Sequence, residues 1–187
     1  MLTKYRFQIA AIAIIVVTAI IALNLQGRVW WCQVGDLWPW SWEVWSKHNS
    51  QHLIDPYSFT HVLHGMLEFW LIGLVFWKVP MAWRFVIAIF VESSWEVIEN
   101  TNYVVNRYRE ATISLDYFGD SIANSIFDIV CCGFGYWISY KLKFWWGLAL
   151  FLLTELVLLF WIHDSLILNI VMLIWPIDAV KHWQMGG

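Results

Sequence analysis

The chain has 187 residues, of which 60% are hydrophobic and only 13% are charged. Apolar runs of membrane-spanning length recur along it, so we predict an all-α, polytopic membrane protein with five to six transmembrane helices in a single domain. The net charge of −3 and the scattering of basic residues in pairs exclude a nucleic-acid partner.

The first predicted span covers residues 6–24. Basic residues precede this apolar run, as they do in a signal sequence, but no small-x-small cleavage site follows it. We therefore predict an uncleaved first span. Cys131 and Cys132 are adjacent in a later apolar run and Cys32 has no obvious partner, so all three cysteines are predicted to be free thiols.

The segment after the first span, residues 25–58, is polar and rich in tryptophan. Trp38, Trp42 and Trp45 would share one face of a short helix that begins near Pro39 and lies in the headgroup layer. One interpretation is an aromatic belt at the membrane interface. The other is a substrate-binding platform, in which Trp42 and Trp45 stack against a sugar or a lipid headgroup.

The later spans and the membrane orientation follow from hydropathy and from the basic residues. Spans are predicted at residues 59–79, 82–104, 119–140 and 144–162, with a loop at 106–119 and a last short segment at 165–177 that is either a sixth span or a re-entrant piece. With the amino terminus in the cytoplasm, the cytoplasmic end receives Lys4, Arg6, Lys78, Arg84, Lys141, Lys143 and Lys181, and the other end receives Arg28, Lys47, Arg107 and Arg109. This bias predicts a multi-pass protein of a bacterial cytoplasmic (inner) membrane.

Polar residues form a stripe on each of three predicted spans. The stripes are His61, His64 and Glu68; Glu92, Glu96, Glu99 and Asn100; and Asp120, Ser121, Asn124, Ser125 and Asp128. Helical spacing puts each set on one face. A rise of about 1.5 Å per residue predicts three layers, with His61, Asn100 and Asp120 outermost, His64, Glu96 and Asn124 in the middle, and Glu68, Glu92 and Asp128 innermost. Ionisable groups are costly in a membrane, so the stripes predict a polar cavity open to the extracytoplasmic side.

The residue types in these stripes favour a divalent-metal site. Imidazole suits zinc or iron, and carboxylate suits zinc, manganese or magnesium. The predicted metal, zinc first, would be held by His61, His64, Glu68, Glu96 and Asp128. The alternative is that the acids are partly protonated and hold the bundle together by hydrogen bonds. The sequence contains no HExxH and no GxSxG motif, so the named zinc-protease and serine-hydrolase signatures are excluded.

Three functions agree with these patterns. The first is a membrane-embedded enzyme that acts on a lipid or lipid-linked substrate at the outer leaflet. Its predicted catalytic residues are His64, Glu92, Glu96, Asp120 and Asn124, and Arg107 and Arg109 would hold a phosphate. The second is a carrier of protons or metal ions, which the scarcity of ionisable groups in the cytoplasmic halves of the spans disfavours. The third is a structural or assembly protein of the cell envelope.

Several stretches carry a resemblance to a known family. HVLHG, ESSWEVIENT, RYREATISLDYFGDSIANSIFD and the tryptophan-rich loop resemble an uncharacterised family of small bacterial inner-membrane proteins. More distantly, a histidine in one span, a W-E-x-x-E helix end and a G-D-S helix start are similar to VanZ-like and YjdF-like membrane proteins. The resemblance implies a bacterial membrane location and assigns no reaction. Kinship with VanZ-like proteins would imply an envelope or antibiotic-related role.

Overall fold

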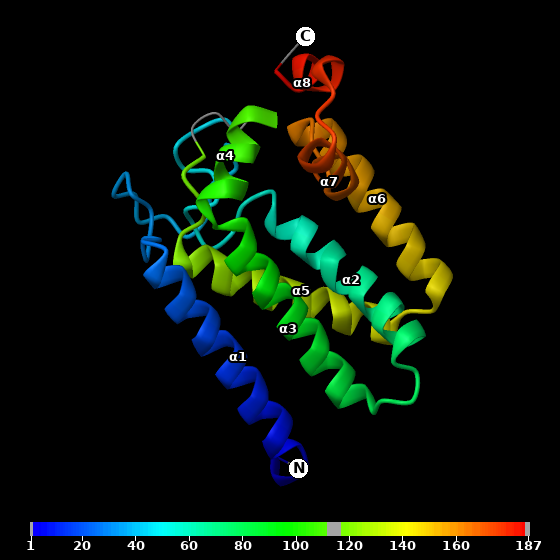
Figure 1. Cartoon of the computed structure of the whole chain (residues 1–187). Coiled ribbons are helices and arrows are strands. Elements are labelled where there is room, and N and C mark those ends of the chain that lie inside the picture. Colours follow the sequence, from blue (N-terminus) through cyan, green and yellow to red (C-terminus); the bar gives the residue numbers. More distant parts are fainter. Residues whose placement is uncertain (1, 112–116, 186–187) are drawn as a thin grey trace.

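The fold is entirely helical, as predicted (Figure 1). A computed structural model describes residues 2–111 and 117–185, and within them the chain forms eight α-helices, a 3-10 turn at Leu2–Tyr5 and no strand. The helices are α1 (Arg6–Leu25), α2 (Ser58–Val75), α3 (Met81–Glu99), α4 (Asn102–Ala111), α5 (Ile122–Lys141), α6 (Phe144–Ile162), α7 (Leu166–Ile174) and α8 (Asp178–Gln184).

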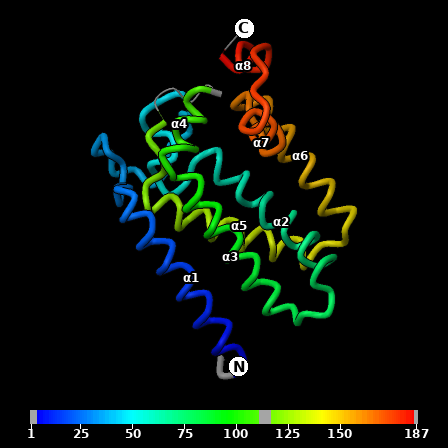
Figure 2. Tube along the Cα trace, in the orientation of Figure 1, coloured from blue at the N-terminus to red at the C-terminus, as the bar shows by residue number. Residues whose placement is uncertain are grey.

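Four of the described helices, α1, α2, α5 and α6, are long and apolar enough to cross a membrane. The third predicted span corresponds to α3, which has 19 residues but carries Arg84 and several glutamates. This helix packs against α1, α2 and α5, as the trace in Figure 2 shows, and it buries Glu92 and Glu96 in the bundle. The helix ends earlier than the predicted residue 104, because Asn100 turns its side chain to bond with Asp120.

The predicted loop at 106–119 is partly wrong, because α4 continues to Ala111. Part of that loop, residues 112–116, lies outside the described residues. The amphipathic helix α4 packs Val104, Val105 and Tyr108 into a small apolar cluster with Tyr117. The cluster fixes α4 above the end of α3, close to α7.

The segment at 165–177 forms a helix that is shorter than a membrane span requires. Its helix α7 has nine residues, which rise about 14 Å at 1.5 Å per residue, against about 30 Å of hydrocarbon. Glu155 of α6 holds the start of α7, because its carboxylate accepts from the backbone N–H groups of Leu166 (2.9 Å) and Ile167 (3.2 Å).

The carboxyl end of the chain therefore stays at the α4 end of the molecule, opposite the amino terminus (Figure 1). Lys181 of α8 donates to the backbone carbonyl of Glu110 in α4. Lys181 was predicted to lie at the same end as the amino terminus, and this prediction is wrong. The α7 helix is too short to return the chain across the bundle, so Lys181 joins the basic residues of the other end.

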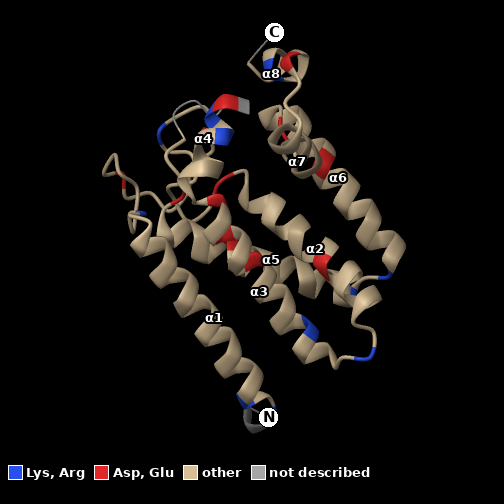
Figure 3. Cartoon of the chain, viewed as in Figure 1, with Lys and Arg blue, Asp and Glu red and all other residues tan. Residues whose placement is uncertain are grey.

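Acidic residues are unevenly distributed along the bundle, whereas lysine and arginine occur at both ends (Figure 3). Lysine and arginine colour the amino terminus and the turns that join α2 to α3 and α5 to α6, all at one end. Most of the acidic residues inside the bundle lie in the half nearer α4. This asymmetry leaves the end with the short basic turns poor in acids.

Two glycines let α2 and α5 pack closely. A Cβ on Gly65 would lie 1.8 Å from the backbone oxygen of Cys132, and a Cβ on Gly135 would lie 1.9 Å from that of Val62. Small residues permit such backbone approach between membrane helices. The close packing of α2 and α5 sets the depth at which the polar stripes of the two helices meet.

The tryptophan-rich segment is irregular, so the predicted helix beginning near Pro39 is wrong. Its backbone pairs instead with a later part of the same loop: Ser41 N donates to Ile54 O at 3.0 Å, and Ile54 N donates to Pro39 O at 3.1 Å. These bonds take the carbonyl that the first helical turn would have used. Ser121 N donates to Ser50 O at 2.9 Å, which ties the loop to the start of α5.

Candidate functional site

Two histidines of α2 share one carboxylate of α3. His64 Nδ1 lies 3.0 Å from Glu92 Oε2, and His61 Nδ1 contacts Glu92 Oε1. The spacing of three residues brings both rings to one face of α2, with centroids 4.9 Å apart. One atom from each of the three groups lies within 4.8 Å of the others, which is close enough to bind one metal ion.

Glu96 and Asp128 extend this cluster from α3 and α5. Glu96 Oε1 lies 3.3 Å from His61 Nδ1, and Asp128 Oδ2 lies 3.9 Å from His61 Nε2. Both side chains are buried, yet neither oxygen of Glu96 nor Oδ1 of Asp128 has a hydrogen-bond partner among the described residues. Buried polar atoms without partners are costly. The arrangement therefore favours the uptake of a proton or a cation.

The predicted layers are shifted on α2. His61, predicted in the outer layer with Asn100 and Asp120, contacts Glu92 and Glu96 instead. Its ring reaches residues of the predicted middle and inner layers. His61 therefore lies nearer the middle of the bundle than its predicted layer.

Glu68, predicted as a metal ligand, lies deeper than the histidines. The Cys132 thiol donates to Glu68 Oε2 at 3.1 Å, and these two groups and Glu92 lie within 4.8 Å of one another. Beyond Glu68 aromatic rings fill the bundle: those of Phe69 and Phe85 pack on Tyr136 with centroids 5.1 and 5.3 Å apart. The row of acidic and histidine side chains that begins at the cavity thus ends at Glu68.

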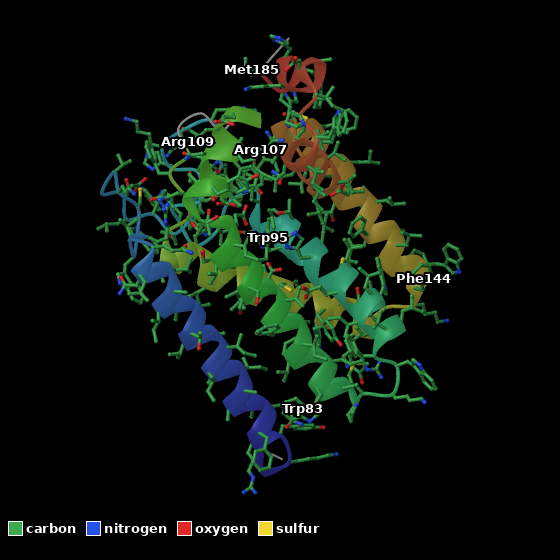
Figure 4. All side chains as sticks on the ribbon, in the orientation of Figure 1. Trp83, Trp95, Arg107, Arg109, Phe144 and Met185 are labelled. Atoms are coloured by element: carbon green, nitrogen blue, oxygen red, sulfur yellow. The ribbon has the colours of Figure 1, made fainter. Side chains whose placement is uncertain are left out.

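A cavity of about 60 Å³ opens beside the cluster. Its lining includes His61, His64, Glu99, Asp120 and Asp128, together with Asn49 and Ser50 of the first loop, and Leu166, Ile170 and Leu173 of α7. Trp95 lies in the middle of the bundle, in the region of α3 and α2 (Figure 4), and its ring meets His64 edge-on at 6.3 Å.

Asp120 is fully engaged at the outer wall of the cavity. Its carboxylate accepts from Asn100 Nδ2 at 2.6 Å and from the Tyr117 hydroxyl at 2.9 Å, and its backbone N–H donates to Asn100 Oδ1 at 2.7 Å. Burial raises the pKa of Asp120, and these donors oppose the rise. Such contacts are typical of a residue that holds two segments together.

Asn124 holds the first loop, and sequence reasoning missed its partner Asp55. Asn124 Nδ2 donates to His52 O at 2.9 Å and lies 3.4 Å from Asp55 Oδ2. Asp55 Oδ1 caps α2 by accepting from the backbone N–H groups of Tyr57 (2.7 Å) and Ser58 (3.1 Å). Burial, and then the charge of Asp120, raise the pKa of Asp55 to about 6. An acid two to three residues before a helix is a capping pattern, which was the available signal.

The predicted phosphate-binding arginines are both on α4, at the end of the molecule opposite the amino terminus (Figure 4). Arg107 Nε donates to Leu173 O at 3.0 Å, at the end of α7, and Arg109 Nε donates to Tyr117 O at 2.5 Å. The guanidinium of Arg109 also lies over the ring of Phe118. Neither arginine lines the cavity among its described lining residues.

The predicted platform residues Trp42 and Trp45 lie against the end of α6 and outside the cavity lining that is described. Trp42 contacts Trp161 at 5.6 Å between ring centroids, and Trp45 contacts His163 at 6.2 Å. Both tryptophans stay about half exposed. They extend the apolar surface of α6, in keeping with the aromatic-belt interpretation.

The cluster has no cationic partner apart from histidine. Every ion pair in the described part of the chain involves a histidine, and none involves lysine or arginine. Five buried acids, Asp55, Glu92, Glu96, Asp120 and Asp128, gather around His61 and His64 or in the wall above them. Charge balance in this region therefore depends on protons or on an added cation.

The fold and the cluster together define a class: an all-helical chain with helices of membrane-spanning length, built around a buried group of histidines and carboxyl groups. The family described as a protein of unknown function (DUF2585) matches residues 23–186, and the chain belongs to this family. The predicted membership of an uncharacterised family is confirmed.

The relatives are bacterial proteins that carry the name UPF0314. The chain is 44% identical to the one from Rhizobium meliloti (strain 1021), over 89% of this chain and 85% of the relative. It is 39% identical to the one from Paracoccus denitrificans (strain Pd 1222), over 91% and 89%. It is 38% identical to the one from Brucella anthropi, over 97% and 93%. No solved structure matches this chain.

Proposed function

We propose that this protein is a membrane-embedded, metal-dependent hydrolase of a lipid or lipid-linked substrate. The observation that carries the proposal is the cluster of His61, His64 and Glu92, whose ligand atoms lie within 4.8 Å of one another beside a cavity. Imidazole and carboxylate together favour zinc. Three protein ligands leave one position free for water or substrate, as catalytic zinc requires.

The residues around the ligands fit the parts of a hydrolytic reaction. A zinc ion at this place would lower the pKa of a bound water and polarise a phosphoryl or carbonyl oxygen. Glu96 lies next to His61 with both oxygens free of hydrogen bonds, so it can accept the proton of the attacking water. Asp128 faces the other nitrogen of His61 at 3.9 Å and would orient that ring.

The lining of the cavity fits an amphipathic substrate. Leu166, Ile170 and Leu173 recur at helical spacing along α7 and form an apolar wall, while the opposite wall carries His64 and Asp128. A lipid bound here would place its headgroup ester between the apolar wall and the polar wall. The reacting group would lie in the cavity, and the rest of the substrate would lie towards α7 and the outer leaflet.

The end of the polar chain favours an enzyme over a carrier. A carrier needs polar groups at successive depths from one membrane face to the other. Here the chain of groups stops at Glu68, above the packed rings of Phe69, Phe85 and Tyr136.

We infer a bacterial inner-membrane location with the amino terminus in the cytoplasm. Six basic residues, Lys4, Arg6, Lys78, Arg84, Lys141 and Lys143, belong to the amino-terminal end and the short turns. The other five basic residues belong to the first loop, α4 and α8, and they are Arg28, Lys47, Arg107, Arg109 and Lys181. This bias supports a cavity that opens away from the cytoplasm.

The experiment is metal analysis coupled to a lipid assay on the full chain in detergent. Zinc should co-purify, chelator should lower the melting temperature, and zinc should restore hydrolysis of lipid phosphates in mixed micelles. His64→Ala and Glu92→Gln should abolish the hydrolysis and the part of the chelator response that this site contributes. His182→Ala, at an exposed position of α8, is the matched control and should change neither. Full zinc loading in His64→Ala together with Glu92→Gln would overturn the metal assignment.

A further inference from the structure

We propose a second metal site in the first loop, formed by Cys32, His48 and His52, that holds one zinc ion in a structural role. One ligand atom from each residue lies within 4.8 Å of the other two. Cys32 and His52 are buried, and all three cysteines of the chain are free of disulfides. This site shares no residue with the cavity cluster, so it stands whether or not the proposed hydrolase activity is correct.

The distances between the ligand atoms match tetrahedral zinc. Bonds of about 2.3 Å to sulfur and about 2.05 Å to nitrogen, at tetrahedral angles, require about 3.6 Å from sulfur to nitrogen and about 3.3 Å between nitrogens. Cys32 Sγ lies 3.5 Å from His48 Nδ1, and His48 Nδ1 lies 3.2 Å from His52 Nε2. An ion could enter with almost no rearrangement of the loop.

The hydrogen bond made by His52 Nδ1 favours the tautomer that a metal ligand needs. Its Nδ1 lies 2.5 Å from the backbone carbonyl of Trp38 and must donate a proton to it. The Nε2 atom of the neutral ring then presents a lone pair towards His48 Nδ1. A carbonyl that fixes the tautomer of a ligating histidine in this way is the usual outer contact of zinc sites.

Two turns in the backbone of the loop help to bring the three ligands together. Gly35 has φ of +84° and donates its N–H to Cys32 O at 3.2 Å, so the chain turns sharply after the cysteine. Ser50 has φ of +55°, a left-handed conformation that is uncommon for a residue other than glycine, and it lies between the two histidines. Strained residues of this kind cluster at functional sites.

Asp36 lies beside His48, and the site has access to water. Asp36 Oδ2 lies 4.0 Å from His48 Nδ1, while Oδ1 accepts from the backbone N–H of Trp38 at 3.0 Å. The side chains of His48 and Asp36 are 28% and 35% exposed. A surface hollow of about 420 Å³ adjoins them and gives an ion a route from water. On binding, the Cys32 thiol releases its proton to that water.

An ion at this site would hold in place the part of the first loop that lines the cavity beside His61 and His64. The residues between the two histidines include Asn49 and Ser50, which line the cavity, and Gln51, which donates to Gly119 O at 2.7 Å. His52 O accepts from Asn124 at 2.9 Å. An ion that joins His48 and His52 to Cys32 would tie this wall to the end of α1.

Cobalt titration tests the site, because a thiolate bound to Co²⁺ gives a charge-transfer band in the near ultraviolet. The full chain, reduced and stripped with chelator in detergent, should develop this band with one equivalent of Co²⁺ and lose it when Zn²⁺ is added. Cys32→Ser and His48→Ala should abolish the band. His48 is partly exposed, so its variant should keep the fold, as circular dichroism will check.

Two further variants keep the result specific. Cys132→Ser removes the other thiol that lies near carboxylates, and His64→Ala removes a ligand of the cavity cluster; both should retain the band. A folded protein without the band, or a band that survives Cys32→Ser, would mean that the three side chains only hydrogen-bond one another, and would overturn this site. Retention of the band without lipid hydrolysis would overturn the hydrolase alone.

Discussion

Asn100 and Asp120 bind each other twice, with Asn100 Nδ2 donating to the Asp120 carboxylate at 2.6 Å and Asp120 N donating to Asn100 Oδ1 at 2.7 Å. Asn100 is fully buried, so truncation leaves an acceptor and a donor of Asp120 unsatisfied in the interior. We expect Asn100→Ala to lower the free energy of unfolding by about 2 kcal/mol. Denaturant unfolding in detergent measures this loss. Asn106→Ala, at an exposed position of α4, should be neutral, and equal losses in the two variants would contradict the prediction.

A methyl group at Gly135 should force α2 and α5 apart. Its Cβ would lie 1.9 Å from Val62 O, a backbone atom that cannot move without the helix. We expect Gly135→Ala to cost about 3 kcal/mol of stability, at the upper end of overpacking effects. Because His61 and His64 move with α2, zinc binding should weaken as well.

Gly133→Ala on the same helix is the matched control. Its Cβ would lie 3.4 Å from the Phe85 ring, an ordinary contact, so the helices keep their separation. Thermal melts of both variants, with and without zinc, decide the matter. If Gly133→Ala proves as harmful as Gly135→Ala, the loss reflects a general effect of alanine on α5 and not the close backbone contact.

The same two glycines mark how far the sequence could predict the site. Helical spacing brings His61, His64 and Glu92 to facing stripes, and the structure brings them together. The predicted depth of the α2 residues was wrong, because counting residues assumes that the helices are parallel and start at one level. Close packing at Gly65 and Gly135 sets the real depth.

The loop could not be predicted in the same way, because it has no period. His48, His52 and Cys32 meet through backbone turns, and Ser50, between the two histidines, is in a left-handed conformation. Tryptophan spacing suggested a helix beginning near Pro39, and long-range pairing with Ile54 prevented it. Local sequence patterns do not predict backbone pairing between distant parts of a loop.

Asp164 should make stability fall as pH rises from about 4 to about 6. Burial raises its pKa from 3.8 to about 6, against the hydrogen bonds that it accepts from Asn169, Ser165 and Tyr57. Below the unfolded pKa both states are protonated and nothing is lost. As pH passes through the folded pKa the native state must hold a buried charge, which costs about 3 kcal/mol at 1.36 kcal/mol per pKa unit.

Asp164→Asn should remove this part of the pH dependence. Melting curves recorded from pH 4 to pH 7 should be flatter for the variant than for the unmodified chain. Asp178→Asn, at an exposed position, should leave the slope as it was. If the slope persists in Asp164→Asn, it belongs to another group, and Asp55, whose pKa burial also raises to about 6, is the next to replace.

Variants of Glu96 and Asp120 should distinguish an effect on metal binding from an effect on stability. Both are buried acids that were predicted to be catalytic, but Asp120 accepts from Asn100 and Tyr117, whereas neither oxygen of Glu96 has a hydrogen-bond partner within the described residues. Amide replacement keeps the shape of each side chain and removes its charge. The two variants should therefore fail in different ways.

In Glu96→Gln the metal-free protein should melt at the same temperature or higher, because the replaced carboxyl group is buried and neither of its oxygens has a hydrogen-bond partner in the described part of the chain. Zinc affinity should fall about 10- to 100-fold, the usual effect of losing a carboxylate beside a metal ligand, and hydrolysis should stop. In Asp120→Asn the amide nitrogen would replace one of the two oxygens that accept from Asn100 and Tyr117, so one of these hydrogen bonds is lost, and the protein should melt earlier while zinc binds about as before. Calorimetric titration and melting of both variants measure all four quantities. A Glu96→Gln protein that melts early and binds zinc normally would make Glu96 part of the scaffold and leave the cavity without its proton acceptor.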